Sequence, residues 1–146
     1  MAEQSAPATF GVDHVGLSVR DLESTRRFFC DCLGWRVVGG RPDYPAVFVS
    51  DGQDLVTLWQ VEAPDRAVAF DRRANVGLHH LAFAVAERAG FDALHERVAK
   101  WPGVVVEFAP ELLGAGPKMH FMVREPSGVR IEFDFDPRLE EARKQR

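Results

Sequence analysis

The sequence contains little cysteine and no long apolar run. Only two of its 146 residues are cysteine, Cys30 and Cys32. Two positions apart on a helix, these side chains would point in nearly opposite directions, which disfavours a disulfide between them. The apolar stretches are no longer than strands, so none is expected to span a membrane. Residues 1–8 lack the basic and apolar regions of a secretory signal. We therefore expect a cytoplasmic protein with reduced thiols and a short disordered lead at residues 1–8.

The sequence also lacks an excess of basic charge. Lysine and arginine total 18 against 22 acidic residues, which gives a formal net charge of -4, and the basic residues are scattered. A nucleic-acid-binding surface is therefore not indicated. Apolar residues make up 46% of the chain, which is enough to build the core of an ordinary domain. We expect the partner to be a small molecule and neither a nucleic acid nor a membrane.

Two segments of the chain resemble each other. Both Gly11–Val19 and Gly77–Val85 read Gly-x-x-His followed by alternating apolar residues, and a helical pattern follows each. Three strand-like runs come after each helix, so the order is β-α-β-β-β, twice. This predicts an α+β protein with a single domain over 9–136. We divide the chain into module one at 9–62, a linker at 63–76, module two at 77–136 and a charged helix or tail at 137–146.

Local signals set the expected ends of these elements. Asp21 is a suitable N-cap for the first helix, and Gly34 is expected to end it. Pro102-Gly103 is expected to end the second helix. Pro110–Pro117 is rich in glycine and is predicted to be a loop. The predicted strands after the helices cover residues 35–38, 46–50, 55–61, 104–108, 119–123 and 129–135.

Alternation along the strands selects a set of polar residues on one face of the sheet. The large apolar stripes, such as Ile131, Phe133 and Phe135, should pack under the helices. His14, His80 and Glu132 then fall on the opposite face, and His120 shares it. The neighbouring His79 is expected to point to the helix side.

Two imidazoles and a carboxylate from separate strands can hold one divalent metal and leave coordination positions open. We interpret His14, His80 and Glu132 as ligands of Fe2+, Mn2+, Ni2+ or Zn2+, among which the sequence does not choose. His120 is interpreted as a nearby acid, base or hydrogen-bond donor. The alternative for each residue is a solvated or hydrogen-bonded histidine without a metal.

Further residues are candidates for the walls of a cavity. Trp59 and Met122 share parity with Thr57 and His120, so they are predicted to line it, with simple core packing as the alternative. Arg124 and Arg130 lie near one end of the sheet, where they are suited to an anionic substrate. Solvated surface arginines are the alternative there.

These motifs resemble the vicinal oxygen chelate superfamily, which includes glyoxalase I, bleomycin-resistance and fosfomycin-resistance proteins and extradiol dioxygenases. The resemblance covers about Phe10 to Asp136. It rests on Asp13-His14-Val15, Phe28-Phe29-x-x-x-Leu33-Gly34-Trp35, His80-Leu81-Ala82-Phe83 and Glu125-Pro126-Ser127-Gly128-x-x-Ile131-Glu132. It implies paired βαβββ modules that form a cupped mixed sheet, a homodimer, and His14, His80 and Glu132 as the metal ligands.

The sequence departs from this family at one ligand. The position of the fourth ligand of glyoxalase I is Thr57 here, and a hydroxyl is a poor ligand for these metals. This disfavours lactoylglutathione lyase activity. A dioxygenase, another lyase or isomerase, or a thiol transferase fits the remaining three ligands. The alternative is a metal-free binding protein like the bleomycin-resistance proteins. The sequence does not tell whether one chain or two chains complete the site.

Overall fold

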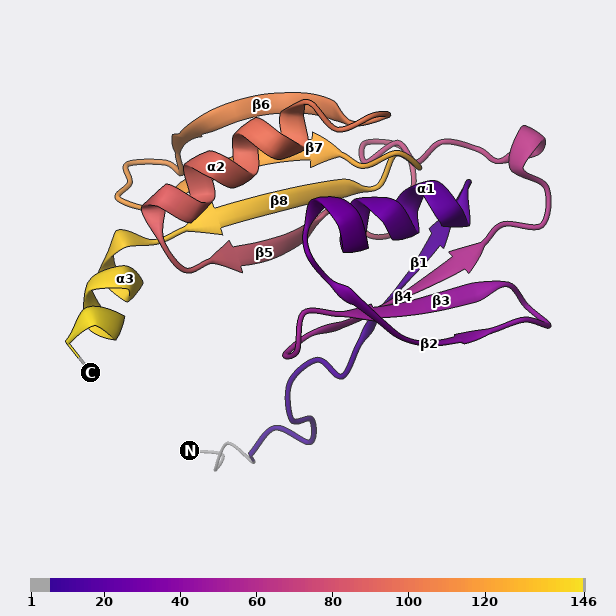
Figure 1. Cartoon of the computed structure of the whole chain (residues 1–146), viewed down its shortest axis with the longest axis horizontal. Coiled ribbons are helices and arrows are strands. Elements are labelled where there is room, and N and C mark those ends of the chain that lie inside the picture. Colours follow the sequence, from indigo (N-terminus) through magenta and orange to yellow (C-terminus); the bar gives the residue numbers. More distant parts are fainter. Residues whose placement is uncertain (1–5, 146) are drawn as a thin grey trace, which may run out of the picture.

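The computed structural model describes residues 6–145, so the first five residues of the predicted disordered lead at 1–8 lie outside them. Two successive βαβββ units follow one another along the chain (Figure 1). The first consists of β1 (Val15–Val19), α1 (Leu22–Arg27), β2 (Arg36–Arg41), β3 (Ala46–Ser50) and β4 (Leu55–Gln60). The second consists of β5 (Leu81–Val85), α2 (Arg88–Ala99), β6 (Val105–Leu112), β7 (Met119–Arg124) and β8 (Arg130–Phe135). The predicted α+β class is confirmed.

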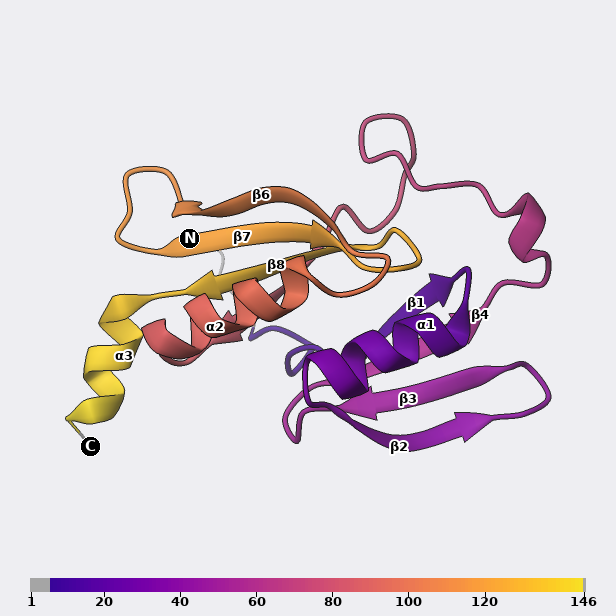
Figure 2. The ribbon, with the colours of Figure 1, turned by 45° about the horizontal axis from the view of Figure 1, so that its top comes forward.

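Each unit forms a four-stranded mixed sheet. The strand orders are β1-β4-β3-β2 and β5-β8-β7-β6, and the parallel pairs are β1 with β4 and β5 with β8. The two sheets lie side by side, with α1 over the first and α2 over the second (Figures 1 and 2). The linker, which contains the short 3-10 helix η2 (Pro64–Arg66), loops out beyond the sheets (Figure 2). The chain ends in α3 (Pro137–Lys144).

The first helix begins as the sequence predicts, but its second half is different. The Asp21 side chain accepts a hydrogen bond from the Ser24 backbone N–H, as an N-cap does. After α1 the chain widens into a π-helical turn, η1 (Phe28–Cys32), which buries Phe28 and Phe29 completely. Gly34 then turns the chain with a φ of 81°, a value that glycine adopts without strain.

β6 is longer than predicted. It continues to Leu112 and therefore includes the beginning of the segment predicted as a loop, Pro110–Pro117. The pairing of β6 with β7 shifts register twice before Glu111 comes opposite His120. Such irregularities, together with a position at the edge of the sheet, allow a strand to continue through proline.

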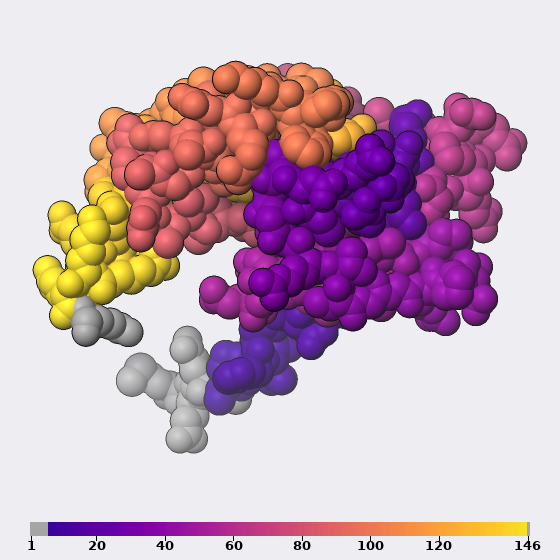
Figure 3. Space-filling view, in the orientation of Figure 1, coloured from indigo at the N-terminus to yellow at the C-terminus, as the bar shows by residue number. Residues whose placement is uncertain are grey.

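One hydrophobic core joins the two units. The side chains of Phe29 and Trp35 in the first unit contact Phe83 of β5, with ring centroids 6.3 and 5.1 Å apart respectively. Across the same junction, the Arg97 guanidinium of α2 donates a hydrogen bond to the Cys32 carbonyl. In the space-filling view the two units form one body, and the described N-terminal segment leads away from it (Figure 3). No helix within residues 6–145 has the length and apolar character that crossing a membrane requires.

Candidate functional site

The alternation predicted for β7 and β8 is present. Ile131, Phe133 and Phe135 are buried in the core, and Glu132 therefore lies on the opposite face of β8. In the sheet Met122 lies opposite Glu132 and His120 lies opposite Asp134. We call this face of the second sheet, away from α2, the open face.

Glu132 is the centre of a cluster of ligand-type groups on the open face. One of its oxygens, Oε2, lies 3.0 Å from His80 Nε2, and the other, Oε1, lies 2.5 Å from His120 Nδ1. Ligand-type atoms of His120, Glu132 and Asp134 lie within 4.8 Å of one another. Glu132 is only 8% exposed, so its charge needs partners such as these. The structure thus brings together three residues that the sequence placed on one face: His80, His120 and Glu132.

Asp134 extends this cluster and was not among the residues predicted from the sequence. Its Oδ2 lies 3.0 Å from the Lys118 ammonium. Its Oδ1 is buried and finds no hydrogen-bond partner among residues 6–145. The signal was present in the sequence, because Asp134 shares the parity of Glu132 along β8.

Hydrogen bonds around His80 indicate which of its nitrogens carries a hydrogen. Arg130 Nη1 lies 3.1 Å from His79 Nδ1, and a guanidinium is only a donor, so His79 Nδ1 accepts. His79 Nδ1 also lies 2.7 Å from His80 Nδ1, which must then donate. A neutral His80 therefore carries its lone pair on Nε2, the atom beside Glu132. This Nε2 atom lies 3.0 Å from Glu132 Oε2, so the two atoms are close enough to bind one cation together.

His79 itself lies elsewhere than the sequence predicts. It contacts Arg130, on the open face, instead of pointing to the helices. His79 and His80 both precede β5, which begins at Leu81, so their contacts with Arg130 and Glu132, and not strand alternation, set their directions. Desolvation, followed by the nearby Arg130 charge, lowers the pKa of His79 and favours its neutral form.

His14 is not part of this cluster. Its imidazole is 50% exposed, and its Nδ1 lies 2.6 Å from the carboxylate of Asp13. Because that carboxylate accepts a hydrogen bond from Nδ1, a neutral His14 also has its lone pair on Nε2. Within one chain the described residues do not bring this ring into the cluster around Glu132.

The predicted cavity residues lie on two different sheets. Thr57 and Trp59 are on β4, where the Trp59 indole donates a hydrogen bond to the Thr57 hydroxyl over 2.9 Å. Thr57 is only 4% exposed. Gln60 points to the helices, where its side chain accepts from the Leu22 N–H, so β4 keeps the predicted register. Met122 is buried beside Glu132 on the second sheet.

Arg130 and Arg124 converge on a residue that the sequence analysis did not single out. Arg130 donates hydrogen bonds to both oxygens of Glu107 over 2.8 to 3.1 Å and is itself 9% exposed. The Arg124 side chain reaches within 3.7 Å of the same carboxylate. The hydrogen bonds from Arg130 lower the pKa of Glu107, so it is ionised. Its position on the irregular strand β6 left no simple signal in the sequence.

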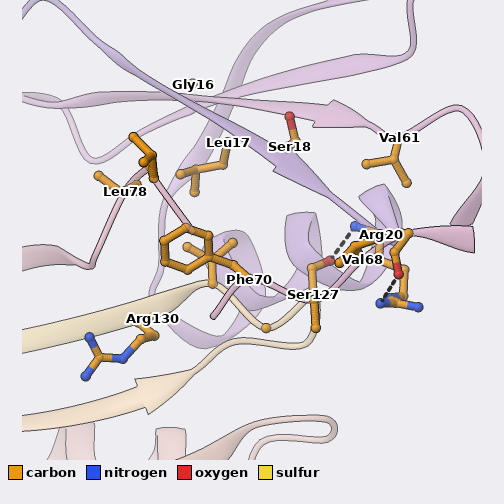
Figure 4. A pocket seen from close by; sticks show the side chains of 16 residues that line it. Gly16, Leu17, Ser18, Arg20, Val61, Val68, Phe70, Leu78, Ser127 and Arg130 are labelled. Carbon is orange, nitrogen blue, oxygen red and sulfur yellow. Dashed lines mark hydrogen bonds between the residues drawn. The ribbon is translucent and has the colours of Figure 1, made fainter. Parts of the chain in front are cut away.

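A cavity of about 380 Å³ lies between the two units, next to the open face. Its walls come from β1, from the linker and from the turn before β8. Figure 4 shows Phe70 of the linker, and Leu78 just after it, facing Leu17 of β1, with Ser127 and Arg130 on the opposite wall. The Phe70 ring packs on Gly77, where an added Cβ would lie 2.9 Å from the ring. The first glycine of the second Gly-x-x-His motif thus makes room for a wall of this cavity.

Two successive βαβββ units, each a four-stranded mixed sheet with a helix on one side, define a class of proteins built from paired modules of this kind. The chain belongs to the Glyoxalase/Bleomycin resistance protein/Dioxygenase superfamily, whose family model matches residues 11–133. This match confirms the resemblance found in the sequence. Divalent metals are usual in this family.

Individual relatives differ in their activities. A catechol-2,3-dioxygenase of Bacillus subtilis is 30% identical over 78 residues. The match covers 51% of this chain and 26% of the dioxygenase, so the chain spans about a quarter of the dioxygenase. A 2-epi-5-epi-valiolone epimerase of Actinomyces sp. is 27% identical over 141 residues, covering 80% of this chain and 73% of the epimerase. Among solved structures, a glyoxalase/bleomycin resistance protein/dioxygenase domain from Frankia sp. EAN1pec has a TM-score of 0.73 and 27% identity, with 88% of this chain and 99% of that chain covered.

Proposed function

We propose that the protein is a divalent-metal-dependent enzyme of the glyoxalase/dioxygenase type, which chelates a small oxygenated substrate. His14, His80 and Glu132 are the proposed ligands. The observation that carries the proposal is the 3.0 Å separation of His80 Nε2 and Glu132 Oε2, at which both atoms can bind one metal ion. A neutral imidazole beside a carboxylate is the donor set that Fe2+, Mn2+, Ni2+ and Zn2+ share.

The third ligand, His14, is proposed to come from a second copy of the chain. Its exposed ring supports this, because the imidazole is separate from the cluster in its own chain. The residues that lead into both histidine-bearing strands give further support. Phe10 and Val12 precede His14 and are 105% and 81% exposed, and Val76 precedes His80 and is 106% exposed. Apolar side chains that solvent surrounds so fully favour coverage by a partner.

The remaining residues have distinct roles in this proposal. The metal, when bound, supplies a Lewis acid that polarises adjacent oxygens of the substrate. His120 donates a hydrogen bond from Nδ1 to Glu132 and so orients that ligand, while its Nε2, 3.6 Å from the Glu111 carboxylate, is the atom proposed to exchange a proton with the substrate. Thr57 offers no fourth carboxylate, and its hydroxyl accepts a hydrogen bond from Trp59. The proposed reaction is therefore a dioxygenase, lyase, isomerase or thiol transferase reaction, with lactoylglutathione lyase disfavoured.

Metal analysis of protein purified without an affinity tag tests this proposal. We expect about one equivalent of a divalent metal per chain. His80→Ala and Glu132→Gln should each remove it, whereas the control His95→Ala, on α2, should keep it. A wild-type chain that stays metal-free when offered Fe2+, Mn2+, Ni2+ and Zn2+ would contradict the proposal.

A metal-free binding protein is the second candidate. It is favoured by an aromatic cluster on the first sheet, where Tyr44 and Phe48 flank Trp59 with ring centroids 5.0 and 5.9 Å away. Such a cluster is suited to an aromatic or cationic ligand. Ligand binding that persists in Glu132→Gln and after chelation of metals would favour this candidate over the enzyme.

A further inference from the structure

A depression lined by arginines adjoins the open face of the second sheet. It has a volume of about 540 Å³. Three guanidinium groups line it, those of Arg72 in the linker, Arg124 at the end of β7 and Arg130 at the start of β8. This site is distinct from the metal ligands, and the sequence placed only two of its three arginines near each other.

The charges in this depression do not cancel. Arg130 is fully engaged, because it binds both oxygens of Glu107 and the His79 carbonyl. Glu107 is therefore neutralised within the protein. Arg124 is 50% exposed on its side chain and reaches Glu107 only at 3.7 Å. Arg72 is exposed. The guanidinium groups of Arg72 and Arg124 are thus left to bind an anion.

One carboxylate in the lining belongs to its own turn. Asp71 accepts a hydrogen bond from the Arg73 backbone N–H over 2.8 Å. This hydrogen bond holds Asp71 Oδ1 to its own turn, and the three arginines of the lining still outnumber its two carboxylates, Glu107 and Asp71.

The depression lies close to the proposed metal ligands. Phe108 forms one of its walls, and the Phe108 ring centroid lies 4.8 Å from that of His120, which contacts Glu132. Arg130 precedes Glu132 by two residues on the same face of β8, a separation of roughly 7 Å along a strand. A small molecule can therefore contact the arginines and the metal ligands at once. Phe70 and Phe108 supply apolar walls for the part of the molecule between them.

We propose that Arg72 and Arg124 form a subsite for an oxyanion, either a carboxylate or a phosphate, on a small substrate whose apolar part lies against Phe70 and Phe108. Arg130 and Glu107 hold the floor of this subsite in place as a neutral pair. Two guanidinium forks suit a carboxylate or a phosphate, because each can donate two parallel hydrogen bonds. The inference rests on the proposed function for the reaction that follows binding, but the anion subsite itself needs no metal.

Binding to the metal-free, full-length protein tests the subsite. Benzoate and phenyl phosphate are titrated by calorimetry into wild type and into the double variant Arg72→Ala/Arg124→Ala. We expect the double variant to bind the preferred probe roughly tenfold more weakly or worse. The stronger of the two probes identifies the anion as carboxylate or phosphate.

A second double variant controls for overall charge. Arg88→Ala/Arg138→Ala removes the same two positive charges from exposed sites outside the depression. Its binding should change by less than about twofold. Equal weakening in both double variants, or no binding of either probe to wild type, would overturn the subsite.

A third probe separates this inference from the proposed function. The compound 3,4-dihydroxybenzoate carries a carboxylate and two adjacent oxygens. If both proposals hold, loading the protein with Mn2+ tightens its binding, and the arginine variants weaken it. If the arginine dependence remains while Mn2+ has no effect, the subsite is supported and the metal centre is contradicted.

Discussion

At the scale of single residues, Glu132 is held from both sides on the open face. His80 approaches one oxygen and His120 the other. His120 is 12% exposed on its side chain, so its contact with Glu132 is shielded from water. A shielded hydrogen bond to a ligand carboxylate orients that ligand and influences how tightly it holds a metal.

Replacing His120 should therefore weaken metal binding without abolishing it. We expect His120→Ala to raise the dissociation constant for Mn2+ by roughly 10 to 100-fold. His120→Asn keeps an N–H donor near the position of Nδ1 and should restore most of the affinity. Competition with a fluorescent chelator measures both constants.

Activity gives a second readout for the same pair of variants. Because an amide does not exchange a proton as an imidazole does, His120→Asn should bind metal but lose most of the turnover. Unchanged affinity in His120→Ala would show that His120 does not support Glu132.

At the scale of elements, a buried carboxylate ties the two units together. Glu125, in the turn between β7 and β8, is 1% exposed. Its Oε2 accepts a hydrogen bond from the Thr25 hydroxyl of α1 over 2.7 Å, and its Oε1 accepts from the Ser127 and Val129 N–H groups. The turn that begins β8, the strand of Glu132, is thus anchored to the first unit.

This anchor should make stability depend on pH. Burial raises the pKa of Glu125, despite the hydrogen bonds that oppose the rise. The folded chain therefore binds a proton at a higher pH than the unfolded chain, and stability falls as pH rises from the ordinary glutamate value through the folded value. Glu125→Gln removes this pH-dependent contribution to the free energy of unfolding. Its free energy of unfolding relative to wild type should increase as pH rises above the ordinary glutamate value of 4.5.

The change has this sign because burial disfavours the ionised carboxylate of Glu125 and leaves the neutral amide of glutamine unaffected by pH. Urea unfolding at several pH values measures it. Glu96→Gln, on the exposed side of α2, serves as the control and should show a difference that does not vary with pH. A difference for Glu125→Gln that is equally flat would contradict the prediction.

At the scale of the whole molecule, the two histidines of the internal repeat are found in different surroundings. His80 lies against Glu132, whereas His14 is half exposed beside Asp13. A second copy of the chain resolves this difference if each site takes His14 from one copy and His80 with Glu132 from the other. Homodimers commonly have such two-fold interfaces, which build two equivalent sites.

Mixed dimers test whether the site is shared. Chains with His14→Ala and with His80→Ala are expressed together under two different cleavable tags, and dimers that contain both are isolated before the tags are removed. In a shared site, one of the two sites then has both substitutions and the other has neither. We expect about one metal ion per mixed dimer, against none for either variant alone.

A site within one chain predicts the opposite result. Each chain of the mixed dimer would then lack one ligand, and metal would be absent from both. Wild-type protein that remains a monomer in analytical ultracentrifugation would also contradict the shared site.

The sequence by itself determined which residues share a face. The period of two along β7 and β8 placed His120 and Glu132 opposite the buried stripe, and the Asp21 cap and Gly34 set the limits of the first helical segment. These features depend on local backbone geometry, which neighbouring residues specify. His79 marks the limit of this reasoning, because it lies just outside the strand whose alternation was applied to it.

Only the tertiary structure decided which of these residues meet. Three features depend on how the strands and the linker pack. Glu132 meets His80 and His120, His14 lies apart from them, and Arg72, Arg124 and Arg130 converge around Glu107. The irregular pairing of β6 adds positions that simple alternation does not follow. Strand periodicity fixes the direction of a side chain but not its distance to another strand, and that distance is set by the packing of the two units through their common core.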